Sequence, residues 1–143
     1  MSKLSVLKEQ FAAAQKRMQD EGKVALEEAL AEVFTAHPKL HAIRWTQYTP
    51  YFNDGEACVF GVNSPYIKFD GLAEDAGDYE DGFEYCGTYR DDERPKGFVS
   101  AGKDVLAVFN SIPDELMLGV FEDHVQVTAT REGTFIVEEH SHD

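Results

Sequence analysis

The stretch LHAIRWTQYTPYFNDGEACVFGV, residues 40–62, decides the fold class, because it has the pattern of a β-hairpin. Residues 40–48 are rich in β-branched and aromatic side chains, and their alternation places Ile43, Trp45 and Gln47 on one face of a strand. The run ACVFGV, residues 57–62, is the expected partner strand. Between them stand Asn53, Asp54 and Gly55, which are turn-forming residues, and Gly55 can adopt the positive φ of a tight turn.

Helical and strand patterns continue on both sides of this hairpin. Residues 2–37 carry apolar side chains at three- and four-residue spacings, and Gly22 interrupts them, which favours two helical segments in near continuity. Pro38 ends the second segment. Further strands are expected at 66–69 and 83–89, helices at 98–112 and from Pro113 to residue 121, and a second hairpin at 124–139.

This order of elements predicts an α+β fold. It consists of one or two N-terminal helical segments, a mainly antiparallel sheet, a further helix pair and a C-terminal β-hairpin. One domain is expected over residues 1–143, with 1–37 as its N-terminal helical part and 38–143 as a sheet-containing body that includes an acidic loop at 70–82. The apolar helical positions 4, 7, 11, 14 and 18 fit either a core face or the seam of a homodimer.

The charge of the chain is strongly negative and unevenly placed. Thirteen basic and 27 acidic side chains give a net charge of −14. Residues 1–69 hold eight of each sign, whereas 70–143 hold five basic and nineteen acidic side chains, ten of them carboxylates within 70–93. Direct binding to nucleic acid or to an anionic membrane surface requires clustered Lys and Arg, so both are disfavoured. A basic protein is the partner that this charge predicts.

The apolar runs, the N-terminal residues and the cysteines indicate the cellular compartment. No apolar run reaches the roughly 20 residues of a membrane span, and the first residues, MSKLSVLKEQF, lack the apolar core of a signal peptide. We therefore predict a cytoplasmic protein without membrane association. In that reducing compartment Cys58 and Cys86 are expected as small buried thiols rather than as a disulfide.

Catalytic and metal-binding patterns are incomplete. Cys86 has no base or glycine-rich elbow beside it, and neighbouring carboxylates are expected to keep its thiol protonated. Asp54 and Glu56 at a hairpin tip fit turn chemistry better than acid–base catalysis. The run DAGDYEDG, residues 75–82, does not match a calcium loop. His140 and His142 are spaced to share a metal on a strand, but a charged, frayed terminus is the better explanation. We predict no catalytic residue, metal site or cofactor.

The hairpin itself combines groups that are common in recognition surfaces. Arg and Tyr are enriched in binding hot spots, and Gln offers both a donor and an acceptor. A turn that merely supports the sheet is the alternative. The predicted binding residues are Arg44, Trp45, Gln47, Tyr48, Tyr51, Asn53, Asp54 and Glu56 from the hairpin, and Asp78, Glu80, Asp81 and Glu84 from the acidic region.

Two stretches resemble known sequences. AIRWTQYTPYFNDGEACVFGV (42–62) and EDHVQVTATREGTFIVEEHSHD (122–143) are similar to a group of small uncharacterised proteins of tailed phages and bacteria. The resemblance implies an intracellular accessory protein, and it transfers no activity or site residue.

The function expected from these observations is non-enzymatic binding to a basic surface, such as that of a nucleic-acid-handling protein. The alternative is a small-molecule-binding domain or small enzyme with its pocket between the 44–56 hairpin and the 82–90 strand.

Overall fold

A central strand organises the fold. The computed structural model describes residues 2–49, 60–72, 82–87 and 94–140. Within them, β1 (Leu40–Tyr48) lies in the middle of an antiparallel sheet with the strand order β4-β3-β1-β5-β6, and β2 pairs with the end of β1. The other strands are β2 (Gly61–Val62), β3 (Tyr66–Phe69), β4 (Glu84–Tyr85), β5 (Val125–Thr130) and β6 (Phe135–Glu139).

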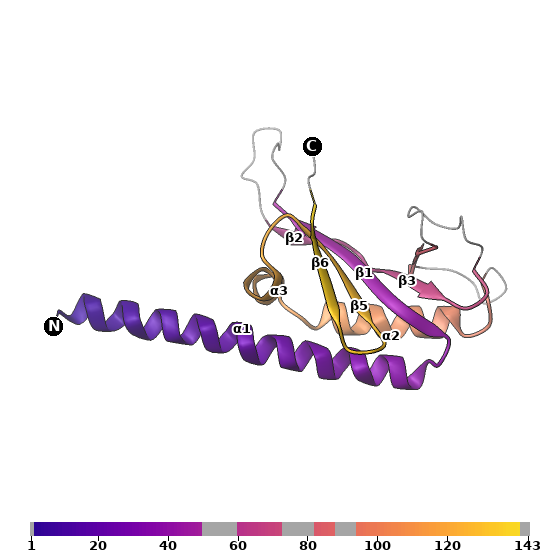
Figure 1. Ribbon diagram of the computed structural model, residues 1–143, viewed down its shortest axis with the longest axis horizontal. Coiled ribbons are helices and arrows are strands. Elements are labelled where there is room, and N and C mark those ends of the chain that lie inside the picture. Colours follow the sequence, from indigo (N-terminus) through magenta and orange to yellow (C-terminus); the bar gives the residue numbers. More distant parts are fainter. Residues whose placement is uncertain (1, 50–59, 73–81, 88–93, 141–143) are drawn as a thin grey trace.

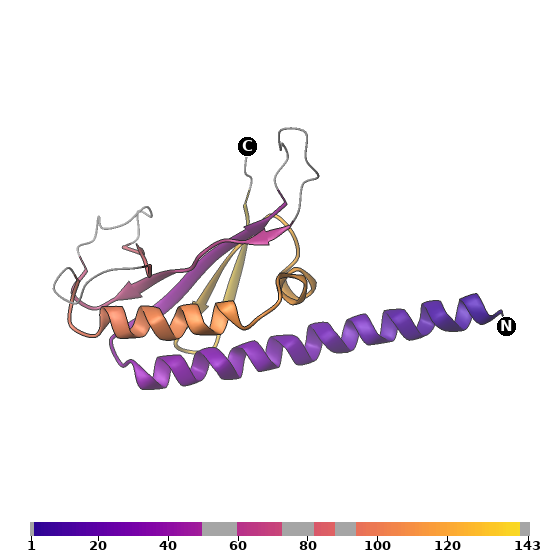
Figure 2. The same cartoon turned by 180° about the vertical axis from the view of Figure 1, so that it is seen from behind.

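The helices lie against one face of this sheet. They are α1 (Lys3–Ala36), α2 (Phe98–Asn110) and α3 (Asp114–Phe121), with Pro113 as the N-cap residue of α3. Figures 1 and 2 show α1 and α2 running beneath the same side of the sheet. We call the opposite side, which carries no described helix, the helix-free face. The predicted α+β fold, with its antiparallel sheet, helix pair and C-terminal hairpin, is confirmed.

Trp45 is at the centre of the core between the sheet and the helices. Its side chain has no exposed surface, and its ring meets the rings of Phe109 and Phe121 edge-on at centroid distances of 5.0 and 5.5 Å. Ile43 and Gln47, two residues to either side, are equally inaccessible to solvent. The alternation predicted for residues 40–48 is therefore confirmed, because all three side chains face the helices.

The helix α1 is one continuous helix of 34 residues, and the prediction of two segments that meet at Gly22 is wrong. A single Gly costs a helix only about 1 kcal/mol, which the good helix formers around it can offset. Gly22 is buried, and a Cβ atom at this position would lie 2.7 Å from Cδ1 of Leu116 in α3. Its missing side chain therefore lets α3 approach α1 closely.

Only the second half of α1 belongs to the core. Its buried positions begin at Gly22 and continue with Leu26, Leu30, Val33 and Phe34. Every residue from 2 to 21 is exposed, and Figures 1 and 2 both show this half extending beyond the sheet. The apolar positions 4, 7, 11, 14 and 18 thus do not form a core face within this chain. We call residues 2–21 the arm.

Candidate functional site

The predicted binding residues of β1 lie on two different sides of the sheet. Trp45 and Gln47 face the helices and have no exposed surface. Arg44 and Tyr48 alternate with them toward the helix-free face and are half-buried. Of the predicted binding residues in β1, a partner can therefore contact only Arg44 and Tyr48 directly.

Gln47 is the centre of a buried hydrogen-bond network. Its Oε1 accepts a bond of 3.0 Å from Nε1 of Trp45. Its Nε2 donates to the carbonyl oxygens of Met117 at 2.9 Å and of Glu122 at 2.7 Å, near the end of α3. The carbonyl of Glu122 lies just beyond α3 and has no partner within the helix, so the side-chain amide of Gln47 satisfies it. The role of Gln47 is to join β1 to the turn that follows α3.

That turn, residues 122–124, has an unusual backbone. Glu122 and His124 have φ angles of +76° and +55°, a region that residues other than glycine rarely adopt. Such a conformation persists only where surrounding contacts impose it, and it is common at functional sites. On the side of the core, Gln47 donates its hydrogen bond to the carbonyl oxygen of Glu122. On the other side, Asp123 accepts hydrogen bonds from the backbone N–H and the hydroxyl of Thr49, at 2.8 and 2.7 Å.

These contacts also set the ionisation of Asp123. Desolvation on its own would raise the pKa of this carboxyl group. The hydrogen bonds from Thr49 and from the backbone N–H of His124, together with the charge of His124, outweigh it and lower the pKa below its ordinary value of 3.8. Asp123 is therefore a fixed negative charge at neutral pH.

Further carboxylates lie beside this turn on β6. Glu139 pairs with Val125, and Glu138 pairs with Gln126. The backbone N–H of His140 donates to the carbonyl oxygen of His124 at 2.7 Å, which brings the end of β6 next to the turn. We call the group of Glu122, Asp123, Glu138 and Glu139 the acidic end of the sheet. Figure 1 shows the end of β6, the start of β5 and the strand β2 converging there.

The acidic end has little internal charge compensation. Glu122, Glu138 and Glu139 are exposed, and within the described part of the chain none of them forms an ion pair with Lys or Arg. The rings of Tyr48 and His140 lie beside one another, with centroids 5.9 Å apart, at the same end of the sheet. The structure thus combines a concentration of negative charge with an aromatic pair, which suits contact with Lys or Arg side chains.

Arg44 lies farther along the helix-free face. Its guanidinium group is 4.0 Å from the centroid of the Phe83 ring, and its Nε donates to Oγ1 of Thr128 at 3.0 Å. Phe83 is buried, so this stacking covers part of the sheet. Arg44 therefore has a structural role that its spacing in the sequence does not reveal.

Glu84 and Arg44 lie on opposite faces. In the sheet register Glu84 pairs with Ile67, which faces the core, whereas Arg44 pairs with Tyr66 on the helix-free face. A carboxylate oxygen of Glu84 lies 3.3 Å from Nη2 of Arg94. The structure does not bring Arg44 and Glu84 together, so these two residues do not line a common pocket.

Cys86 is an inert thiol in this structure. It is buried, and its Sγ donates to the carbonyl oxygen of Pro65 at 3.0 Å. Burial raises the pKa of the thiol from 9.0 to about 12. The thiolate that a nucleophilic cysteine requires is therefore scarce at neutral pH, as the sequence predicts, but the dominant cause is desolvation rather than neighbouring carboxylates.

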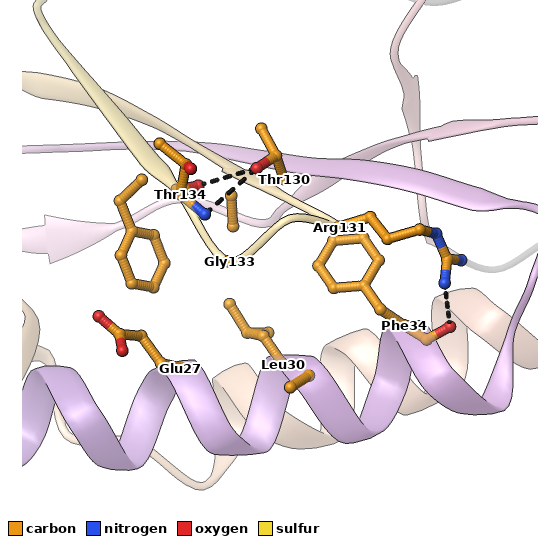
Figure 3. Close-up of a pocket in the computed structure, with 10 residues that line it drawn as sticks. Glu27, Leu30, Phe34, Thr130, Arg131, Gly133 and Thr134 are labelled. Atoms are coloured by element: carbon orange, nitrogen blue, oxygen red, sulfur yellow. Dashed lines mark hydrogen bonds between the residues drawn. The ribbon is translucent and has the colours of Figure 1, made fainter.

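A small pocket separates α1 from the turn between β5 and β6 (Figure 3). Its volume is about 30 Å³, the share of one water molecule in the liquid, and far below the several hundred Å³ of a typical metabolite site. Arg131 lies at its edge and donates to the carbonyl oxygens of Phe34, His37 and Leu40 at distances between 2.6 and 3.1 Å. The carbonyl of Phe34 lies in the last turn of α1, and those of His37 and Leu40 follow the helix, so Arg131 is a cationic cap that joins the hairpin to the helix.

Several predicted residues fall outside the described part of the chain. They are Tyr51, Asn53, Asp54, Glu56, Asp78, Glu80 and Asp81, together with Cys58 and His142. Among the residues that the structure does describe, no group of three or more His, Cys, Asp and Glu is placed to hold a metal ion.

Local sequence patterns do not predict the contributions of Thr49, Glu122 and Asp123. A weak signal was present, since Glu-Asp-His directly follows a helix pattern and precedes a strand pattern, where a turn with a polar anchor is common. Thr49, which anchors that turn, lies 74 residues before Asp123, and no local pattern indicates that the two residues are in contact.

Comparisons with protein families, with curated proteins and with solved structures found no match for this chain. The resemblance to the phage and bacterial group stays a prediction. No helix among the described residues is both long and apolar enough to cross a membrane.

Proposed function

We propose that this protein is a binding protein that engages a basic surface of another protein, such as one that handles nucleic acid, through the acidic end of its sheet. The observation that carries the proposal is the anchored turn at 122–124. Its strained backbone is supported by Gln47, which bonds the backbone carbonyl of Glu122, and by Thr49, which holds the carboxylate of Asp123 in a fixed position near those of β6. Groups fixed before binding lose little conformational entropy when a partner docks.

The position of β6 supports this proposal. In the described sheet β6 pairs only with β5, so it is an edge strand. Its side chains Ile136 and Val137 are 45% and 48% exposed, and Glu138 and Glu139 follow them. An edge strand can pair through its backbone with an extended segment of a partner. The two glutamates favour a segment that carries Lys or Arg.

The acidic block at 70–93 has a complementary role in the proposal. Its ten carboxylates raise the negative potential of the molecule, which accelerates encounters with a positive partner more than it increases affinity. Contact at the acidic end then determines how long the complex lasts.

The test compares two variants with the same change in net charge. The first replaces Glu122, Glu138 and Glu139 with Gln, and the control replaces the exposed residues Glu28, Glu32 and Glu132 with Gln. Each protein is immobilised and exposed to a nuclease-treated cell lysate, and captured proteins are quantified by mass spectrometry. We expect the parent and the control to capture the same basic protein in similar amounts. The acidic-end variant should capture at least about ten-fold less of it. Equal capture by all three, or no specific protein with the parent, would refute the proposal.

Once the partner is known, association rates test the role of the acidic block. Replacing Asp78, Glu80 and Asp81 with Asn or Gln should slow association and reduce its salt dependence. Glu84 is left unchanged, because its replacement would also remove the contact with Arg94. Association at low salt that is as fast as that of the parent would contradict the steering role.

A further inference from the structure

We propose that the arm, residues 2–21, pairs with the arm of a second copy of this chain as an antiparallel two-stranded coiled coil. This inference is independent of the proposed function, because it concerns residues far from the acidic end of the sheet. It rests on the exposure, spacing, size and charge of the side chains of the arm.

The arm carries one continuous apolar seam. Its members are Leu4, Leu7, Phe11, Ala14 and Met18, which alternate three- and four-residue steps. This is the a and d pattern of a heptad repeat, with a period of 3.5 residues, and it is typical of a seam that faces another helix. The four large side chains are 62%, 60%, 65% and 56% exposed for Leu4, Leu7, Phe11 and Met18. Such a row of exposed large apolar residues marks an interaction surface.

The protein itself leaves this seam uncovered. The buried face of α1 starts at Gly22 and follows a different phase, through Leu26 and Leu30. Most helical stability in proteins comes from the packing of an apolar face, and the seam of the arm has no such packing within this chain. Pairing with a second helix would therefore stabilise the arm as well as cover its apolar side chains.

The sizes of the seam residues favour the antiparallel arrangement. In an antiparallel coiled coil, a positions face d positions, so Phe11 packs beside Ala14 of the second copy and Leu7 beside Met18 of the second copy. A large side chain next to a small one fills the space between helices well. A parallel pair would instead place Phe11 against Phe11 and Ala14 against Ala14, which alternates crowding with a void.

The charges favour the same arrangement. Residues 1–23 hold five basic and three acidic side chains, which leaves eight basic and 24 acidic side chains in the rest of the chain. A parallel pair would bring two strongly negative bodies to the same end and would place Lys3 beside Lys8 of the second copy. An antiparallel pair separates the bodies. In the same register Leu4 lies opposite Glu21 of the second copy, and the neighbouring Lys3 supplies a positive charge beside that carboxylate.

Sedimentation equilibrium of the full-length chain tests the association. The seam variant is Phe11→Glu, and the matched control is Ala13→Glu, which adds the same charge at an exposed position of the same helix outside the seam. We expect the parent and the control to have twice the chain mass of 16.0 kDa at micromolar concentration. We expect Phe11→Glu to weaken dimerisation on the order of 100-fold, because each dimer contains the change twice, while its thermal unfolding remains like that of the control.

Cysteine cross-linking tests the orientation. The variants Leu7→Cys and Met18→Cys are made separately and oxidised both alone and as a mixture. The parent is oxidised in parallel, to measure the disulfides formed by the two native cysteines. The antiparallel pair predicts a disulfide between the two different variants. A disulfide within each single variant would show a parallel pair and overturn the proposal. A parent that sediments as a monomer, or a dimer that Phe11→Glu leaves intact, would overturn it as well.

Discussion

Replacement of Gln47 by Leu tests whether this buried amide has a structural role in the fold. Leu has a similar size but can make none of the three hydrogen bonds that Gln47 forms with Trp45, Met117 and Glu122. Each such bond contributes about 1 kcal/mol, and leaving a buried partner unsatisfied costs about 1–3 kcal/mol. The apolar side chain recovers roughly 1 kcal/mol through burial. The three lost bonds less this recovery give a net loss of unfolding free energy of about 2 kcal/mol, and a partner left unsatisfied after the turn relaxes raises it to about 3 kcal/mol.

Urea unfolding followed by Trp fluorescence provides the measurement, since Trp45 is the single tryptophan and lies in the network. With an m-value of about 2 kcal/mol/M, the midpoint should fall by roughly 1–1.5 M. Gln126→Leu is the control, because Gln126 is half-buried on the helix-free face and its side chain bonds to no described residue. Its stability should stay within about 0.5 kcal/mol of the parent. A Gln47→Leu protein as stable as the control would refute the structural role of this amide.

Three further predictions concern other contacts of the fold. Arg131→Ala should lower the unfolding free energy by about 2–3 kcal/mol, because the end of α1 loses its cap. Urea unfolding provides the measurement, and an Arg131→Lys variant, which keeps the positive charge, should recover part of the loss. Gly102→Val should cost about 1–3 kcal/mol, since a Cβ there would lie 3.2 Å from Cβ of Cys86, whereas Gly61→Val, with no atom near its Cβ, should be much milder in the same assay. Cys86 should resist alkylation in the folded protein at pH 8. Because the pKa of its thiol is raised from 9.0 to about 12, only the unfolded chain loses this proton just above pH 9. The free energy of unfolding should therefore fall as the pH rises above 9, and it should fall more in the parent than in Cys86→Ala. Rapid modification of Cys86 without unfolding would contradict its burial.

The candidate site shows how far local patterns extend. The sequence places Arg44, Trp45, Gln47 and Tyr48 in one stretch, and the period of a strand divides them between two faces. It cannot indicate that Gln47 binds a turn 75 residues later, because that contact depends on where α3 ends relative to β1. The acidic end of the sheet results from the same arrangement, since its carboxylates come from two separate segments.

Gly22 is a position where the local pattern predicts a break in the helix that the folded protein does not have. A glycine within a helical pattern suggests a break when only its intrinsic propensity is considered. In the folded protein it is the position where α3 packs against α1, and the absence of a side chain is what this contact requires. Propensity is a property of one residue, whereas close packing is a property of two elements.

The sequence by itself determined the α+β class, the strand at 40–48, the C-terminal hairpin and the asymmetry of charge, because these depend on periodicity, turn residues and composition. Only the tertiary structure decided which polar residues are buried, where carboxylates from different segments meet, and which half of α1 has no core to cover it. Arg131 shows the physical reason: its hydrogen bonds reach a carbonyl group 97 residues away, and such contacts exist only after the chain has packed.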